Sequence, residues 1–102
     1  MKNEVLRNLL GVECPEPVEG KAFVYLLLCR DQSYYCGSTS NMQNRFEEHQ
    51  SGEASQWTKT RRPVRLAYCE MLDSLALAYR REKQIKGWTR EKKEKLVRGV
   101  WN

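Results

Sequence analysis

A chain of 102 residues, 40% of them hydrophobic and 30% charged, is long enough for one hydrophobic core and too short for two. This balance excludes an intrinsically disordered chain, and no apolar run is long enough to predict a membrane span. The N-terminus lacks the basic-then-apolar pattern of a secretory signal, so we expect a cytoplasmic protein with no membrane partner.

The net charge of +5 is unevenly distributed along the chain. Residues 1–50 contain five Lys and Arg against seven Asp and Glu, whereas residues 51–102 contain thirteen against six. The first half therefore has a net charge of −2 and the second a net charge of +7. This asymmetry predicts a surface for a polyanion in the second half, although a solvated Lys-rich helix explains the same charge equally well.

The four cysteines indicate no metal site, because they form no CxxC pair and do not cluster with the one histidine. Cys29, Cys36 and Cys69 lie in apolar runs, and we expect them to be buried free thiols in a reducing compartment. Disulfide pairing, including that of Cys14, is the less favoured interpretation.

In chain order, the first element is an N-terminal extension, residues 1–20, ahead of a folded domain that we expect over residues 21–102. The extension contains a short helical pattern (Val5, Leu9 and Leu10) and then an acidic segment with two prolines, which disfavour regular structure. The domain begins with a predicted β-hairpin of residues 22–29 and 34–38.

A helix is predicted next, capped by Ser40 or Asn41, running to about residue 50 and stopped by Gly52. Polar residues 53–62 predict a basic loop, and residues 64–71 a third strand. Two further helices are expected over residues 74–87 and 89–98. This order predicts an α+β fold, with a small three-stranded antiparallel sheet flanked by helices.

The helix after the hairpin carries Met42, Arg45, Phe46 and His49 at positions i, i+3, i+4 and i+7, which form one face. Two polar groups on a face that also buries apolar residues predict that Arg45 and His49 point into a cleft beside the sheet. The alternative is that Arg45 reaches solvent and His49 bonds a backbone carbonyl.

Glu82 shares a predicted helix face with Leu75, Ala78 and Ile85, where a leucine would be expected. A carboxylate at the edge of a core is costly unless it is paired or binds a cation. Neighbouring basic side chains make an ion pair a real alternative to a divalent metal, which is often held by one carboxylate with waters and substrate phosphate.

Tyr25 and Tyr35 lie on the two strands of the hairpin and share a face only if the connecting loop is odd-numbered or bulged. Gly37 would allow a close approach to the backbone. Basic and aromatic side chains alternate after the helix that is predicted to end at about residue 50, a pattern expected for contact with phosphates and bases. The expected nucleic-acid contacts are Trp57, Lys59, Arg61, Arg62, Arg81, Lys83 and Lys86.

Taken in order, these residues resemble the GIY-YIG nuclease superfamily, in particular its small stand-alone bacterial members related to the catalytic domain of Slx1-type endonucleases. Val24-Tyr25-Leu26 stands where the family has GIY, and Tyr35-Cys36-Gly37 where it has YIG. Arg45 and Glu82 match the family's catalytic arginine and metal-binding glutamate. The resemblance covers roughly residues 22–97, with Ser38 where some relatives carry lysine.

This resemblance implies the GIY-YIG endonuclease fold and a divalent-metal-dependent endonuclease acting on DNA, structure-selective rather than sequence-specific and linked to DNA repair or processing. Glu82 would bind one Mg²⁺ or Mn²⁺. Arg45 would stabilise charge on the phosphate. Tyr25 or Tyr35 would deprotonate or orient the attacking water, and a base role requires that nearby cations lower the pKa of that tyrosine. His49 would orient a tyrosine or share in proton transfer.

Two other functions fit the same residues. One is a non-catalytic nucleic-acid-binding domain on the same scaffold, and the other is a nuclease directed to RNA, because phosphate contacts do not separate RNA from DNA. We expect a monomer or weak dimer, and the sequence leaves the need for a protein partner open.

Overall fold

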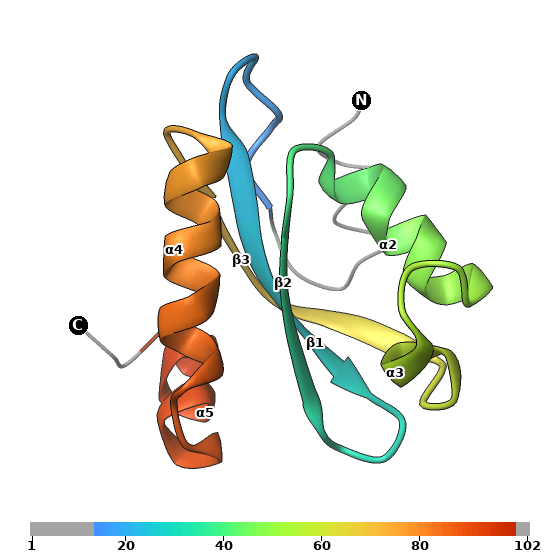
Figure 1. Cartoon of the computed structure of the whole chain (residues 1–102). Helices are drawn as coiled ribbons and strands as arrows, with labels where there is room; N and C mark the ends of the chain where they lie inside the picture. The colour runs from blue at the N-terminus through green and yellow to red at the C-terminus, as the bar shows by residue number, and fades with distance from the viewer. Residues whose placement is uncertain (1–13, 100–102) are drawn as a thin grey trace.

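The computed structural model describes residues 14–99, so the helical pattern predicted around Val5, Leu9 and Leu10 lies outside the described residues. The elements are β1 (Ala22–Cys29), β2 (Tyr34–Thr39), α2 (Met42–Ser51), α3 (Gln56–Lys59), β3 (Val64–Leu72), α4 (Leu75–Lys86) and α5 (Arg90–Arg98). The strands form an antiparallel sheet in the order β2-β1-β3. Helices α2 and α3 lie on one side of it, and α4 and α5 on the other (Figure 1). The predicted α+β fold is confirmed.

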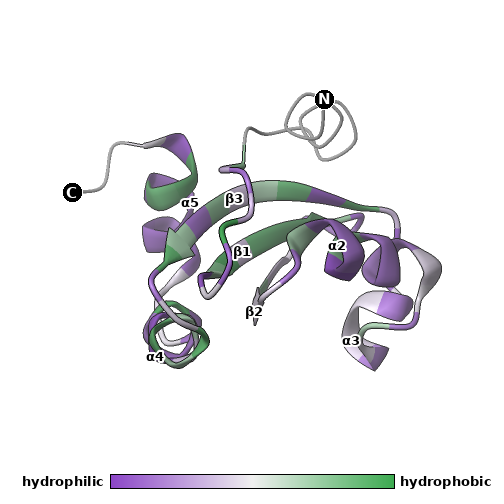
Figure 2. Ribbon diagram, turned by 90° about the horizontal axis from the view of Figure 1, so that it is seen from above, coloured by the Kyte–Doolittle hydropathy of each residue, from purple (hydrophilic) through white to green (hydrophobic). Residues whose placement is uncertain are grey.

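The central strand β1 explains this three-layer arrangement, because its alternating side chains are buried on both faces. Tyr25 and Leu27 pack toward Met42 and Phe46 of α2, among other buried residues. The intervening side chains of β1 instead join a second cluster with Ala78 and Ile85 of α4 and with Leu96 of α5. Figure 2 shows β1 as a largely hydrophobic strand between the helices of the two layers.

The helix boundaries follow the predicted capping residues. The Asn41 side chain accepts a hydrogen bond from the Asn44 amide at 3.0 Å, and Gly52 ends α2 in the left-handed conformation at φ 88°. Ser74 and Thr89 cap α4 and α5 in the same way. None of the helices in the described part of the chain is long and apolar enough to cross a membrane.

Two expectations are wrong. The predicted loop over residues 53–62 contains the short helix α3, which is capped by Ser55. Cys14 and Cys69, 55 residues apart, form a disulfide, because the chain before β1 folds back against β3. Cys29 and Cys36 are buried free thiols as expected, and burial raises the pKa of Cys36 to about 12.

Candidate active site at the edge strand β2

Tyr25 and Tyr35 lie on the same face of the sheet, the face covered by α2 and α3. Tyr25 pairs with Gly37, and Tyr35 pairs with Leu27, two residues along β1 from Tyr25. The hairpin loop sets this register: the Cys29 amide bonds the Ser33 carbonyl at 2.9 Å around three residues, of which Gln32 is left-handed at φ 72°. The loop is therefore of the odd-numbered kind that brings the two tyrosines together.

His49 connects the tyrosines to α2. Its Nε2 lies 2.9 Å from the Tyr25 hydroxyl, and its Nδ1 lies 2.9 Å from the Thr58 hydroxyl. Tyr35 contacts the imidazole through its ring, with the two centroids 5.1 Å apart in an edge-on arrangement. Tyr25, His49 and Thr58 are all fully buried. Both ring nitrogens of His49 therefore bond side-chain hydroxyls, and not a backbone carbonyl as in the alternative.

Burial decides the charge state of this pair. Desolvation raises the pKa of Tyr25 well above its ordinary value, and the nearby Arg45 only partly opposes this. Desolvation, followed by the positive charge of Arg45, lowers the pKa of His49 to about 4. Both groups are thus neutral at pH 7. Cations do not lower the pKa of Tyr25, as a simple base role would require, because desolvation outweighs them.

Arg45 lies at the open side of this cluster. Its guanidinium donates to the Ser38 carbonyl at 3.3 Å and to the Glu48 carboxylate at 3.1 Å, while 38% of the side chain remains exposed. The residue thus lies at the edge of the cluster and keeps donors available at the surface.

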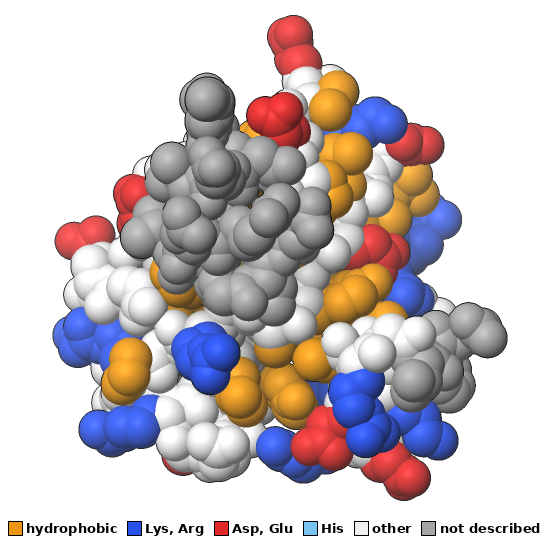
Figure 3. All heavy atoms as spheres, turned by 180° about the vertical axis from the view of Figure 1, so that it is seen from behind, with side chains coloured by type: hydrophobic (Ala, Val, Ile, Leu, Met, Phe, Trp, Pro, Cys, Tyr) orange, Lys and Arg blue, Asp and Glu red, His pale blue; other side chains and the backbone are white. Residues whose placement is uncertain are grey.

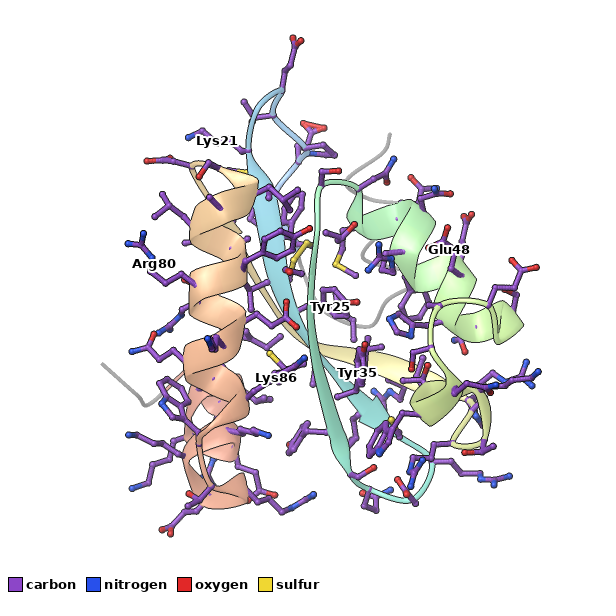
Figure 4. All side chains as sticks on the ribbon, in the orientation of Figure 1. Lys21, Tyr25, Tyr35, Glu48, Arg80 and Lys86 are labelled. Carbon is purple, nitrogen blue, oxygen red and sulfur yellow. A yellow bond between two sulfur atoms is a disulfide. The ribbon has the colours of Figure 1, made fainter. Side chains whose placement is uncertain are left out.

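Glu82 approaches from the other face of the sheet, on α4. The Ser38 hydroxyl donates to one Glu82 carboxylate oxygen at 2.5 Å, and the Lys86 ammonium lies 2.7 Å from the other. Ser38 therefore bonds Arg45 through its carbonyl and Glu82 through its hydroxyl, linking the two sides of the edge strand β2. Figure 4 shows Tyr25 and Tyr35 on the α2 side of β2, and Lys86 reaching toward this strand from α4.

Ser38 and Thr58 belong to the candidate site, although they were not predicted from the sequence. Ser38 follows the YIG-like tripeptide, but only its position hinted at a role, because a short polar residue in a strand has many explanations. Thr58 carried no signal at all, since it falls in the segment predicted to be a loop and only the tertiary structure brings it to His49.

The residues around Glu82 fit a single divalent ion held in part by substrate. Within the described part of the chain, no three His, Cys, Asp or Glu side chains gather to form a complete metal site. Glu82 is one oxygen donor whose side chain is 19% exposed, and its cationic partner Lys86 is 54% exposed and can move aside. One carboxylate completed by waters and phosphate is a usual Mg²⁺ arrangement.

The predicted nucleic-acid-binding residues fall into two groups. Some have partners within the fold: Trp57 stacks on Tyr35 and lies under the Arg61 guanidinium, 4.0 Å from the ring centre, and Arg61 pairs with Asp31. Arg62 bonds the carbonyls of Lys59 and Gln50. Arg81 pairs with Glu70. Lys59, Lys83 and Lys86 are exposed, and Lys86 also pairs with Glu82. The view from behind shows basic side chains interspersed with acidic and hydrophobic ones (Figure 3).

This fold, with two tyrosines, an arginine, a histidine and a glutamate around one hairpin, defines a nuclease-type domain. The chain belongs to the family described as the GIY-YIG catalytic domain, whose model matches residues 21–95. Domains of this kind are typically nucleases, so the substrate class is nucleic acid.

Several relatives share most of this domain. A UPF0213 protein of Staphylococcus haemolyticus is 44% identical over 77 residues, which cover 76% of this chain and 94% of the relative. A UPF0213 protein of Natronomonas pharaonis is also 44% identical, over 74% of this chain and 88% of its own. Among solved structures, a UPF0213 protein from Bacillus halodurans matches at 38% identity with a TM-score of 0.50, over 76% of this chain and 82% of that chain. A protein from E. faecalis matches at 29% identity with a TM-score of 0.58, over 83% and 91%.

Proposed function

We propose that this protein is a divalent-metal-dependent endonuclease that hydrolyses phosphodiester bonds in DNA. The observation that carries the proposal is the link through Ser38, which holds a phosphate-binding group, Arg45, and a candidate metal ligand, Glu82, on the two sides of one edge strand. A phosphate bound across β2 would meet both groups at once. Mg²⁺ or Mn²⁺ bound at Glu82 would neutralise charge on the scissile phosphate.

Arg45 has the exposure and the donors to bind the phosphate. The guanidinium lies near Tyr25 and bonds a carbonyl and a carboxylate, and 38% of its side chain is open to solvent. In the transition state it would hydrogen-bond the phosphate oxygens as negative charge builds on them. Turning toward the phosphate would also uncover the Tyr25 hydroxyl beneath it.

Tyr25 and His49 form the buried pair that would accept the proton of the attacking water. The water would give its proton to the Tyr25 oxygen while Tyr25 gives its own proton to His49 Nε2, 2.9 Å away. A phosphate on Arg45 would offset the positive charge that helps to lower the pKa of His49, and so would make the imidazole a better acceptor when substrate is bound. The leaving oxygen would take its proton from solvent.

Tyr35, unlike Tyr25, is partly exposed to solvent. It is half-buried, packs on His49 and stacks on Trp57, so it would position substrate and support the imidazole. The exposed Lys59, Lys83 and Lys86 would contact further phosphates, and such contacts do not read base sequence. We therefore expect selectivity for branched or flapped DNA shapes, and a role in DNA repair or processing, rather than a preferred cutting sequence.

The test is nicking of supercoiled plasmid and cleavage of flapped oligonucleotides with Mg²⁺ or Mn²⁺, comparing the wild type with Glu82→Gln and Arg45→Ala. We expect each variant to lose about 100-fold or more of the cleavage rate while it still binds DNA. Glu47→Gln, on the exposed face of α2, and Arg80→Ala, whose side chain points away from the sheet (Figure 4), are matched controls that keep activity.

Two results would contradict this proposal. Salt-sensitive binding with no cleavage by the wild type on any substrate would make the domain a nucleic-acid-binding module. Cleavage of RNA oligonucleotides of the same shape, with DNA left intact, would keep the nuclease and replace its substrate.

A further inference from the structure

Thr58 is a buried polar residue with no part in the chemistry proposed so far. It lies in α3, its side chain is fully buried, and its hydroxyl is 2.9 Å from Nδ1 of His49. The other hydrogen-bond partners of this hydroxyl are the hydroxyl and the carbonyl of Ser55, the residue that caps α3. Because buried polar groups satisfy their hydrogen-bonding capacity, the protons in this cluster can be counted.

The hydrogen bonds around Thr58 fit a proton on Nδ1. The Ser55 carbonyl, 3.3 Å from the Thr58 hydroxyl, can only accept, and it offers the single hydrogen of that hydroxyl an acceptor other than Nδ1. The Ser55 hydroxyl, 3.2 Å from the Thr58 oxygen and already accepting from the Thr58 amide, has its own hydrogen to donate. With its hydrogen on that carbonyl, the Thr58 oxygen accepts from both Ser55 and His49, and Nδ1 carries the proton.

A second count, at the other end of the imidazole, gives the same answer. Within the described residues, the Tyr25 hydroxyl has one hydrogen bond by geometry, to Nε2 of His49 at 2.9 Å. Because a buried hydroxyl needs an acceptor for its hydrogen, Tyr25 donates and Nε2 holds a lone pair. The two counts use different residues and agree on one tautomer.

We propose that Thr58, oriented by Ser55, is a positioning residue that holds His49 in the Nδ1–H tautomer, so that Nε2 faces Tyr25 as a proton acceptor. An imidazole free in water favours the opposite tautomer, with the proton on Nε2. In that form Nε2 would donate to the Tyr25 oxygen instead of accepting its proton, and the relay could not begin. A partner that fixes the tautomer of a catalytic histidine is a known requirement of such relays. The catalytic consequence rests on the proposed function, whereas the tautomer itself does not.

The tautomer can be measured directly because the chain contains one histidine. Long-range ¹H–¹⁵N correlation spectra of ¹⁵N-labelled protein near pH 7 distinguish a protonated from an unprotonated ring nitrogen. We expect a protonated Nδ1 and an unprotonated Nε2 in the wild type and in Thr58→Ser, which keeps the hydroxyl. In Thr58→Val, which keeps the shape and loses the hydroxyl, we expect the proton to shift toward Nε2.

Kinetic constants distinguish a role of Thr58 in positioning His49 from a role in packing alone. We expect Thr58→Val to lower kcat by about 10- to 100-fold with KM little changed, and Thr58→Ser to restore most of it. Backbone amide spectra and thermal unfolding check that each variant is folded, and the wild-type spectrum tests the assignment even if Thr58→Val does not fold.

The outcomes also separate this inference from the proposed function. A wild type that cleaves DNA but carries the proton on Nε2 would overturn the inference alone. An unchanged tautomer in folded Thr58→Val would do the same. A wild type with the Nδ1–H tautomer and no cleavage on any substrate would overturn the proposed function and leave the assignment intact.

Discussion

The ring of Tyr25 lies across Gly37, its partner on the neighbouring strand. A Cβ built on Gly37 would stand 2.4 Å from the Tyr25 hydroxyl and 2.6 Å from its Cζ, closer than side-chain atoms approach. The glycine is therefore needed because a side chain at that position would displace the tyrosine, and not because its backbone requires a special conformation. The place of the Tyr25 hydroxyl beside His49 depends on the absence of a methyl group.

Gly37→Ala should accordingly destabilise the protein and move Tyr25. Overpacking of this kind costs about 1–3 kcal/mol, and the fall in unfolding free energy can be measured by urea denaturation. Gly87→Ala is the matched control, since an added Cβ there meets nothing closer than 3.6 Å and the backbone is right-handed at φ −82°. Equal stabilities for the two variants would contradict the steric argument.

Ser38→Ala should disconnect Glu82 from Arg45 without removing either group. The Ser38 hydroxyl is buried and donates to a carboxylate, so its loss should cost about 1–3 kcal/mol of stability. It should also lower the cleavage rate, because Glu82 loses the partner that orients it. Ser40→Ala, at an exposed position two residues on, should match the wild type in plasmid nicking and in urea denaturation. If Ser38→Ala cut DNA at the wild-type rate, Ser38 would not orient the site.

The buried imidazole should make stability depend on pH. The pKa of His49 falls from its ordinary 6.5 to about 4 in the folded protein, so the unfolded chain binds more protons between these values. Stability is then fully present above about pH 6.5 and is lost as the pH falls toward 4, by about 3 kcal/mol. Urea denaturation of the wild type and of His49→Gln at pH 7 and pH 4.5 measures this loss of unfolding free energy. Carboxylates titrate in both proteins, so the difference between them isolates His49, and parallel pH profiles would refute the prediction.

Lys86 should compete with a metal ion for Glu82. Its ammonium lies 2.7 Å from the carboxylate, and removing it frees that oxygen. We expect Lys86→Gln to lower the Mg²⁺ concentration needed for half-maximal cleavage about three- to tenfold, which corresponds to roughly 1 kcal/mol. Stability should change by less than about 0.5 kcal/mol, because this is a helical i, i+4 ion pair whose lysine side chain is 54% exposed.

Lys83→Gln, at an exposed position one turn before Lys86, is the control for loss of a positive charge near DNA. We expect this variant to leave the Mg²⁺ concentration needed for half-maximal cleavage unchanged. If both variants shift the requirement equally, the effect comes from the general field of the helix rather than from competition at Glu82.

The strands, the helix ends and the order of the candidate site residues could be predicted from the sequence alone. Caps such as Asn41 and Thr89 act on amides three residues away, and the face shared by Met42, Phe46 and His49 follows from the helical period. These features depend on neighbours within one or two turns, and therefore the local sequence determines them.

Only the tertiary structure decided how those residues connect. The bond from Ser38 to Glu82 spans 44 residues, that from Tyr25 to His49 spans 24, and the disulfide from Cys14 to Cys69 spans 55. The direction in which the pKa of Tyr25 shifts was also out of reach, because it reflects complete burial, which outweighs the nearby Arg45. Desolvation and long-range hydrogen bonds arise only when distant segments pack, so no local pattern encodes them.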